Sequence, residues 1–255
     1  MLMGEGHMKE TIDDTGFGGI RLIQDLKGFR YGIDAVLLAD FAEGSCPDAM
    51  RAAELGSGNG IISLLLAWQK EGRQVTGIEL QEAAASLAER NAVFNELSDR
   101  VHFVHCDITD LKTRFPEMQG SCDLVVSNPP YIARGSGIPS DTDSLQAARQ
   151  ETTADLEDFV RTAAWLLRGK GTFCMVHRPS RLVDIFYYCR KYRLEPKRIR
   201  FVCPRPGASP NIVLICCVSG GGKELKYDNM FYVYNNQGGY TKELLEIYRK
   251  SQKHP

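Results

Sequence analysis

Short apolar segments alternate with longer helical stretches along most of the chain, and this alternation limits the possible folds more than any other feature. Seven segments have the length and composition of strands: residues 51–55, 74–79, 101–105, 122–127, 171–177, 197–203 and 211–218. Helices are expected between them, over residues 59–70, 83–95, 155–168 and 180–193. Such an alternation predicts an α/β fold, in which a seven-stranded, mostly parallel sheet has helices on both faces and binds ligands at the carboxyl ends of its strands.

A glycine-rich turn follows the first of these strands. Gly56, Gly58 and Gly60 have the spacing G-x-G-x-G and lead into an apolar helix, so backbone N–H groups can approach a ligand without intervening side chains. The G-x-G-x-x-G motif of dinucleotide-binding proteins is not present, because position 61 is isoleucine. About twenty residues further on, Glu79 ends the next strand, where its carboxylate can accept hydrogen bonds from both hydroxyls of a ribose. The isoleucine at position 61 weakens the prediction of a nicotinamide or flavin dinucleotide, whereas the glycines and the acid together favour a ligand that contains a ribose.

A stiff polar loop follows the strand at residues 122–127. Residues 127–131 read Ser-Asn-Pro-Pro-Tyr. Consecutive prolines fix the turn and have no N–H, so backbone carbonyls remain free as acceptors. The side-chain oxygen of Asn128 and the carbonyl of Pro129 could then converge on one NH2 group, while Tyr131 offers a ring on which a flat substrate can stack. The alternative is a proline-rich turn that only closes a strand.

With residues 105–108, which read His-Cys-Asp-Ile, these motifs resemble the class I S-adenosylmethionine-dependent methyltransferases of the amino-group type. The resemblance implies a Rossmann-like fold with S-adenosylmethionine as cofactor. It also implies that Asp107 accepts from the adenine amino group of the cofactor and that the Ile108 backbone contacts the ring. Without the resemblance, Asp107 would be taken as a turn or helix cap. The cofactor-binding residues implied in this way are Tyr31, Asp34, Glu54, Gly56, Gly58, Glu79, Asp107, Ile108 and Asn128.

Four further segments resemble the bacterial tRNA(Val) adenine-N6 methyltransferases, which modify the adenine beside the anticodon. They are residues 29–41, 147–151, 178–182 and 238–241. Members of that family commonly have histidine where this chain has Gln150, so the role of this position is undefined. The resemblance implies that residues 127–131 form the catalytic loop, with Asn128, Pro129 and Tyr131 as catalytic residues. The same loop also occurs in enzymes that methylate protein glutamine or DNA adenine, and these substrates remain alternatives. A cofactor-binding RNA-interaction protein without catalysis is a further alternative, although it would not need Asn128, Pro129 and Tyr131 together.

A basic segment suggests how RNA could be held. Residues 178–205 contain nine Lys or Arg against Asp184 and Glu195, whereas the whole chain has a formal net charge of −1. Such a segment can bind the phosphates of a folded RNA, although an ordinary solvated helix and strand would have the same composition. The predicted substrate-binding residues are Pro130, Tyr131, Arg134, Arg149, Arg178, Arg181, Arg190, Lys191 and Arg193.

Length and composition fit an enzyme of the cytoplasm. The 255 residues suit one α/β domain over residues 46–255, preceded by an N-terminal lead-in over residues 1–45 that packs beside the cofactor. Residues 132–150 are expected to form a mobile substrate lid. No apolar run approaches the roughly 20 residues needed to cross a membrane, and no signal-peptide pattern is present. The eight cysteines include no C-x-x-C pair and the five histidines have no ligand spacing, so no metal is expected. The sequence does not define the oligomeric state, and a monomer fits it.

Overall fold

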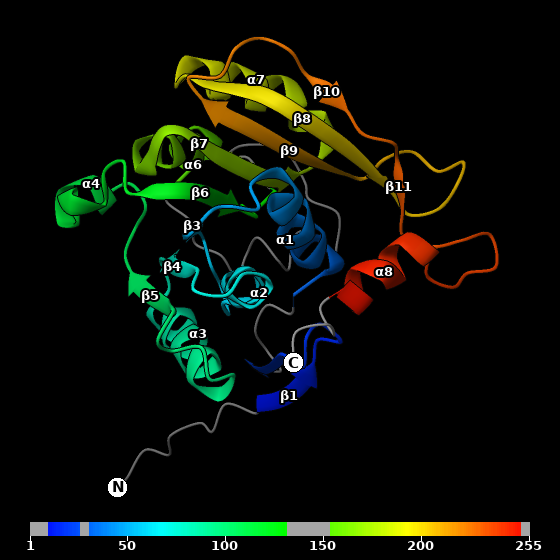
Figure 1. Cartoon of the computed structure of the whole chain (residues 1–255), viewed down its shortest axis with the longest axis horizontal. Helices are drawn as coiled ribbons and strands as arrows, with labels where there is room; N and C mark the ends of the chain where they lie inside the picture. Colours follow the sequence, from blue (N-terminus) through cyan, green and yellow to red (C-terminus); the bar gives the residue numbers. More distant parts are fainter. Residues whose placement is uncertain (1–9, 26–30, 132–153, 251–255) are drawn as a thin grey trace, which may run out of the picture.

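A mixed sheet forms the centre of the protein in the computed structural model, which describes residues 10–25, 31–131 and 154–250 (Figure 1). The strands of this sheet are β3 (Arg51–Leu55), β4 (Gln74–Glu79), β5 (Val101–His105), β6 (Cys122–Ser127), β7 (Leu167–His177), β8 (Leu194–Cys203), β9 (Ile212–Ser219), β10 (Lys226–Tyr227) and β11 (Phe231–Tyr232). Their order is β5-β4-β3-β6-β7-β9-β8-β10, and β11 also pairs with β8. β9 is antiparallel to its neighbours β7 and β8, and the other pairings are parallel.

The helices lie mainly between these strands, as the alternation in the sequence predicts. Those of the described residues are α1 (Ile33–Ser45), α2 (Ile61–Gln69), α3 (Glu82–Phe94), the short α4 (Leu111–Arg114), α6 (Leu156–Leu166), α7 (Leu182–Lys191) and α8 (Lys242–Lys250). Two single-turn 3₁₀ helices, η1 (Pro116–Met118) and η2 (Pro179–Arg181), precede β6 and α7.

All seven predicted strands are confirmed as β3 to β9, and the four predicted helices as α2, α3, α6 and α7. Two features differ from the prediction. The helix expected over residues 155–168 ends at Leu166 and β7 begins at Leu167, because Leu167 already has an extended backbone with φ −75° and ψ 135°. The two-residue strands β10 and β11 extend the sheet to nine strands, since the chain after β9 returns along the outer side of β8.

Alternate residues of the strands supply two separate hydrophobic cores. Leu124 and Val126 of β6 belong to the core under α1 and α2, whereas Val125 belongs to the core under α6 and α7. Successive side chains of a strand point to opposite faces, so a strand covered on both sides must be apolar throughout. The helices on both faces of the sheet are therefore a direct consequence of the continuous apolar runs. Cys174, Cys216 and Cys217, which the sequence suggested as small core residues, are buried.

An N-terminal hairpin, β1 (Glu10–Asp14) and β2 (Arg21–Asp25), packs against α3 and was not predicted. Asn91 and Asn95 of α3 hold it by donating to backbone carbonyls of β2 and accepting from its N–H groups, as a neighbouring strand would. Within the predicted lead-in, α1 shares the core of α2. That the lead-in lies beside a cofactor stays a prediction, and residues 132–150, the predicted lid, fall outside the described residues.

Candidate active site

Four of the predicted site residues lie at one end of the sheet. Gly56 follows β3, Glu79 ends β4, Asp107 comes after β5 and Asn128 follows β6. These four strands are adjacent and parallel, so their carboxyl ends meet at one end of the sheet, called here the carboxyl end. Ligands of open α/β sheets bind at this end.

The glycine turn after β3 has a backbone that other residues would strain. Gly56, Gly58 and Gly60 have φ angles of 72°, 54° and 86°, all in the left-handed region. At Gly60 a Cβ would also lie 2.6 Å from Cζ of Phe103, which leaves no room for a side chain. A Cβ on Gly58, in contrast, would meet no heavy atom within 4 Å. The turn is thus closely packed beneath Gly60 and open beside Gly58.

The carboxylate of Glu79 is fixed by backbone N–H groups on both sides. Its Oε2 accepts from the N–H of Gly58 at 2.7 Å, and its Oε1 accepts from the N–H of Gln81 at 2.9 Å. The side chain is buried at the end of β4. Each carboxylate oxygen has a further lone pair, so both can still accept a hydroxyl proton. The contact with Gly58 joins the predicted ribose acceptor directly to the glycine turn.

Glu54 is directed into the protein rather than along the open side of the turn. It is buried on β3, and its Oε2 accepts from both the N–H and the hydroxyl of Ser63, at 2.8 and 2.6 Å. Burial raises the pKa of Glu54 to about 8, although the hydrogen bonds from Ser63 act in the opposite direction. The carboxyl group therefore carries a proton at neutral pH and joins β3 to the first turn of α2.

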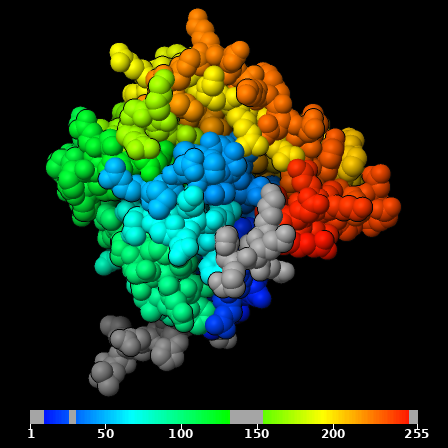
Figure 2. Space-filling view, in the orientation of Figure 1, coloured from blue at the N-terminus to red at the C-terminus, as the bar shows by residue number. Residues whose placement is uncertain are grey.

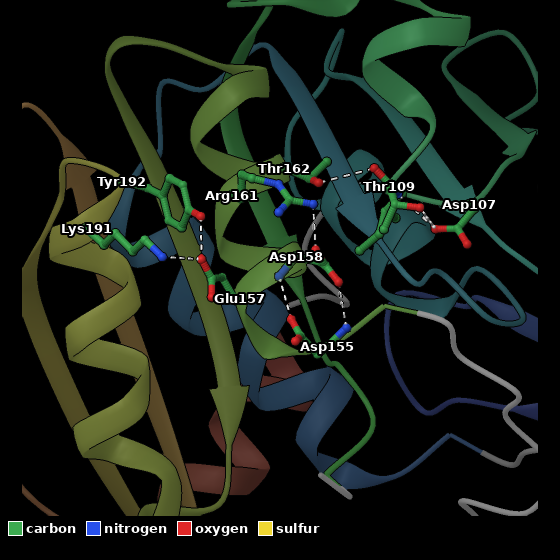
Figure 3. Close-up of polar contacts among 10 residues, drawn as sticks. Asp107, Thr109, Asp155, Glu157, Asp158, Arg161, Thr162, Lys191 and Tyr192 are labelled. Atoms are coloured by element: carbon green, nitrogen blue, oxygen red, sulfur yellow. Dashed lines mark hydrogen bonds and ion pairs between the residues drawn. The ribbon is translucent and has the colours of Figure 1, made fainter. Parts of the chain in front are cut away.

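Asp107 forms the turn that the sequence left as an alternative. Its Oδ1 accepts from the N–H and the hydroxyl of Thr109, both at 2.8 Å (Figure 3). The carbonyl of the neighbouring Ile108 accepts from the hydroxyl of Thr162 on α6 at 3.2 Å. These bonds fix the loop after β5 in place, and the contacts of Asp107 and Ile108 with a cofactor remain predictions.

Asn128, Tyr131 and Asp34 form a hydrogen-bonded cluster next to this row of strand ends. The amide nitrogen of Asn128 donates to Oδ2 of Asp34 at 3.1 Å. The hydroxyl of Tyr131 lies 2.9 Å from the same carboxylate oxygen and 2.9 Å from Oδ1 of Asn128, so its one proton is shared between two acceptors. Because a carboxylate only accepts, Asp34 fixes which way the Asn128 amide points. Of the two prolines in the loop, Pro129 is buried and Pro130 half-buried.

The ring of Tyr131 contacts two residues at the end of β7, His177 and the following Arg178. The Arg178 guanidinium lies over the ring, 4.8 Å from its centroid, and the His177 ring meets it edge-on at 5.2 Å. Burial raises the pKa of the Tyr131 hydroxyl far above its usual range, and the nearby Asp34 carboxylate raises it further. Burial and the positive charge of Arg181 lower the pKa of His177 to about 4, so this histidine is neutral at physiological pH.

Two features of this cluster do not follow from the sequence pattern. Asp34, which the resemblance assigns to the cofactor, also contacts the loop at residues 127–131 across 94 residues of chain, and its contact with a cofactor stays a prediction. His177 had not been singled out; its only sequence signal was its position at the end of a predicted strand. Tyr31, also assigned to the cofactor, precedes α1 and packs partly buried against the core. Contacts between segments so far apart depend on the strand order, which no local pattern contains.

The predicted substrate-binding residues divide between the two ends of the sheet. Arg178 and Arg181 follow β7 at the carboxyl end. Arg193 precedes Leu194, the first residue of β8, at the opposite end. The register of β8 and β9 separates the two ends by about 25 Å. Arg134 and Arg149 fall outside the described residues.

The two neighbouring cations at the far end are paired with acids. Arg190 forms an ion pair with Glu195 at 2.7 Å. Lys191 forms one with Glu157 at 2.6 Å, and Figure 3 draws this second pair. The predicted basic segment is therefore not a single face beside Asn128, because β8 carries the chain along the full height of the sheet.

Neither a metal-binding cluster nor a membrane-spanning helix occurs in residues 10–25, 31–131 and 154–250. These residues hold no group of three or more His, Cys, Asp or Glu that could bind a metal ion. No helix among them is long and apolar enough to cross a membrane. All eight cysteines are free thiols.

Comparison with known proteins agrees with this fold. The methyltransferase small domain family matches residues 34–184. The crystal structure of a predicted O-methyltransferase from Agrobacterium tumefaciens is similar with a TM-score of 0.67 and 21% identity, over 87% of this chain and 98% of that one. The crystal structure of geranyl diphosphate C-methyltransferase from Streptomyces coelicolor, solved with S-adenosyl-L-homocysteine, is similar with a TM-score of 0.52 and 18% identity. This similarity covers 72% of this chain and 77% of that one. Fold and family match together define a methyltransferase of the small-domain class.

Sequence similarity narrows this class. The tRNA1(Val) (adenine(37)-N6)-methyltransferase of Porphyromonas gingivalis is 33% identical to this chain over 189 residues, which are 72% of each protein. The chain belongs to the family of tRNA1(Val) (adenine(37)-N6)-methyltransferases.

Proposed function

We propose that this enzyme transfers the methyl group of S-adenosylmethionine to the exocyclic amino nitrogen of a tRNA adenine, the adenine at position 37 of tRNA1(Val). The observation that carries the proposal is the hydrogen-bonded cluster of Asp34, Asn128 and Tyr131 beside the glycine turn. The resemblance to the family applies to these same residues. We propose that the enzyme acts in the cytoplasm, where it would meet a tRNA substrate.

The carboxyl end of the sheet fits the cofactor. Ser57 Oγ and Asn59 Nδ2 in the glycine turn are buried and have no hydrogen-bond partner among the described residues. Buried polar atoms of this kind are suited to a polar ligand. Gly56, Gly58 and Glu79 would hold the ribose and its attached chain. Asp107 and Ile108, next to the following strand end, would contact the adenine.

S-adenosylmethionine, when bound, supplies an electrophilic methyl group on a sulfonium sulfur. The acceptor nitrogen is a weak nucleophile, because its lone pair is delocalised into the adenine ring. Asn128 Oδ1 and the Pro129 carbonyl would each accept a hydrogen bond from one of the two N–H groups of this nitrogen. These two hydrogen bonds would localise the lone pair and stabilise the positive charge that develops on the nitrogen.

Asp34 has a positioning role in this scheme. It binds the amide nitrogen of Asn128, so Oδ1 is the end of the amide that faces the substrate. A carbonyl oxygen has two lone pairs, so Oδ1 can accept from both Tyr131 and the adenine.

Tyr131 would stack on an adenine turned out of its own stack. Arg178 covers one face of the ring, so the base would occupy the other face. Arg178 and Arg181 stand beside this position and would contact the phosphates of the flipped nucleotide.

Labelled methyl transfer to bulk tRNA, a release factor and duplex DNA in parallel tests the substrate. We expect label in tRNA alone, and N6-methyladenine from one position in the nucleoside digest. Asn128→Ala should lower methyl transfer by on the order of a hundredfold or more, with nearly unchanged cofactor affinity. The matched control is Asn229→Ala, an exposed asparagine remote from the loop, which should keep full activity. Label only in protein glutamine, or equal label in DNA, would contradict the tRNA assignment.

A further inference from the structure

Two tyrosines near the C-terminus are stacked on each other in solvent. Tyr234 and Tyr240 are 42% and 46% exposed, with ring centroids 5.4 Å apart and planes inclined by 25°. The part of the chain that carries them, orange to red in Figure 2, projects from one side of the molecule. Aromatic rings of this size are usually buried. An ordered pair of exposed rings is therefore suited to bind a partner with a flat apolar surface.

Backbone contacts of the hairpin fix the positions of the two tyrosines, and neither ring is part of the two hydrophobic cores. Residues 234 and 240 form an isolated antiparallel bridge. Between them, Oδ1 of Asn235 accepts from the N–H groups of Gln237 and Gly239. The rings are therefore preorganised on a short hairpin, which lowers the entropic cost of binding a further ring.

A chain of contacts joins this hairpin to the catalytic loop. The N–H of Tyr234 donates to the carbonyl of Pro204 at 2.8 Å, at the start of the loop between β8 and β9. At the other end of that loop, the carbonyl of Asn211 accepts from Arg178 at 3.2 Å. Arg178 in turn lies over the ring of Tyr131. The tyrosine pair and Tyr131 thus belong to one surface, at the carboxyl end of the sheet.

The separation suits an unpaired nucleic-acid segment. Between β6, which carries the catalytic loop, and β11, which leads into the hairpin, lie four strand spacings. At about 4.8 Å each they amount to roughly 19 Å, a distance that a few nucleotides of an open loop can bridge.

Exposed cations stand beside the tyrosine pair. Arg205 follows Pro204 directly and Lys242 follows the hairpin; both are exposed, and neither forms an ion pair with any residue in the described ranges. Arg190 and Lys191, predicted from sequence to bind RNA, come before β8 at the other end of the sheet and are in contrast paired with Glu195 and Glu157. Aromatic rings interspersed with free cations are typical of surfaces that bind single-stranded nucleic acid.

We propose that Tyr234, Tyr240 and Arg205 form a second RNA-binding site, which stacks an unpaired base of the substrate loop away from the target adenine and binds a neighbouring phosphate. The inference rests on the proposed function and specifies which part of the RNA this surface holds. Stacking is tolerant of base identity, so the site strengthens binding of an open loop without reading its sequence.

Substitution at Tyr240 tests the site with a matched pair of variants. The probe is a labelled anticodon stem–loop RNA of tRNA(Val), measured by fluorescence anisotropy and as a methylation substrate. Tyr240→Ser should raise the Kd for this RNA and the KM by about 5- to 100-fold, with kcat at saturating RNA and S-adenosylmethionine affinity unchanged. Tyr240→Phe, which keeps the ring, should bind as the parent does. Tyr227 on β10 is 72% exposed, so Tyr227→Ser serves as the control for removing an exposed tyrosine ring elsewhere on the protein. This variant should leave the Kd and KM for the RNA unchanged.

Arg205→Glu provides an independent measurement that does not depend on the hairpin fold. It should weaken RNA binding and lower the slope of log K against log salt by about 0.7, the change for one single-strand phosphate contact. If the parent enzyme methylates the stem–loop while Tyr240→Ser and Arg205→Glu keep parental Kd and KM, the second site is wrong and the proposed function stands. If the parent methylates no RNA, the proposed function itself fails.

Discussion

Replacement of Asp34 by alanine separates two roles that the same residue could have. The sequence resemblance assigns Asp34 to the cofactor, whereas the structure places its carboxylate against Asn128 and Tyr131. Asp34→Ala removes the acceptor for the amide nitrogen of Asn128. The Tyr131 hydroxyl, left with one acceptor, then donates only to Asn128 Oδ1. Only this one bond then holds the amide, so the amide can rotate more readily and present its NH2 group to the substrate amine, where two donors oppose each other.

The magnitude follows from the hydrogen bond that is lost. Hydrogen bonds to charged groups contribute about 1.5–3 kcal/mol. If that energy orients Asn128 in the transition state, its loss slows methyl transfer by about 10- to 150-fold, since each 1.36 kcal/mol corresponds to a factor of ten. Asp34→Asn keeps one acceptor oxygen without the charge, so its loss should be smaller, below about tenfold.

Single-turnover methyl transfer at saturating tRNA and cofactor measures this rate, and calorimetry measures cofactor affinity separately. A double-mutant cycle adds a stricter condition. If Asp34 acts through Asn128, then Asp34→Ala should cause no further loss in an Asn128→Ala background, because the group it orients is gone. The thermal midpoint of each variant shows whether the protein remains folded.

Two results would refute this reasoning. If the Asp34→Ala enzyme transferred the methyl group at the parental rate at saturating cofactor but bound the cofactor more weakly, Asp34 would be a cofactor-binding residue rather than a positioning residue. Additive losses in the double-mutant cycle would show that Asp34 and Asn128 act independently. Either outcome would leave the role of Asn128 itself unaffected.

Two further predictions concern the cofactor end of the site. Glu79→Ala should weaken S-adenosylmethionine binding by about 1.5–3 kcal/mol, because a charged acceptor of the ribose hydroxyls is lost together with the contact that fixes Gly58; calorimetry with unchanged affinity in the folded variant would contradict this. Glu54 has a folded pKa of about 8 against 4.5 in the unfolded chain, so between these values the unfolded state releases a proton that the folded state keeps. The ionisation of Glu54 therefore lowers the free energy of unfolding as pH rises from about 4.5 to 8. Glu54→Gln should flatten this decline in thermal midpoints across that range, and an unchanged slope would argue against the raised pKa.

Local sequence determined most of the secondary structure. Strands such as β6 are apolar at consecutive positions, because both of their faces are covered, and this signal does not depend on the rest of the chain. The hairpin of β1 and β2 was missed for the opposite reason. It has a mixed burial pattern and is held largely by Asn91 and Asn95, far away in sequence.

The sequence also determined that Gly56, Glu79, Asp107 and Asn128 lie at or just after the ends of strands, since each comes at or shortly after the end of an apolar run. Parallel strands bring their carboxyl ends to one end of a sheet, so this much of the site follows from the order of local patterns. The stiff turn of Pro129 and the left-handed glycines are local properties as well.

Only the tertiary structure decided which side chains meet. It placed Asp34 against Asn128, buried Glu54 against Ser63, and joined Tyr234 to the loop that reaches Arg178. It also divided the basic segment between the two ends of the sheet, which composition had presented as one surface. The physical reason is that a side-chain contact depends on strand order, register and burial, and these are set by packing of the whole chain rather than by any short stretch of it.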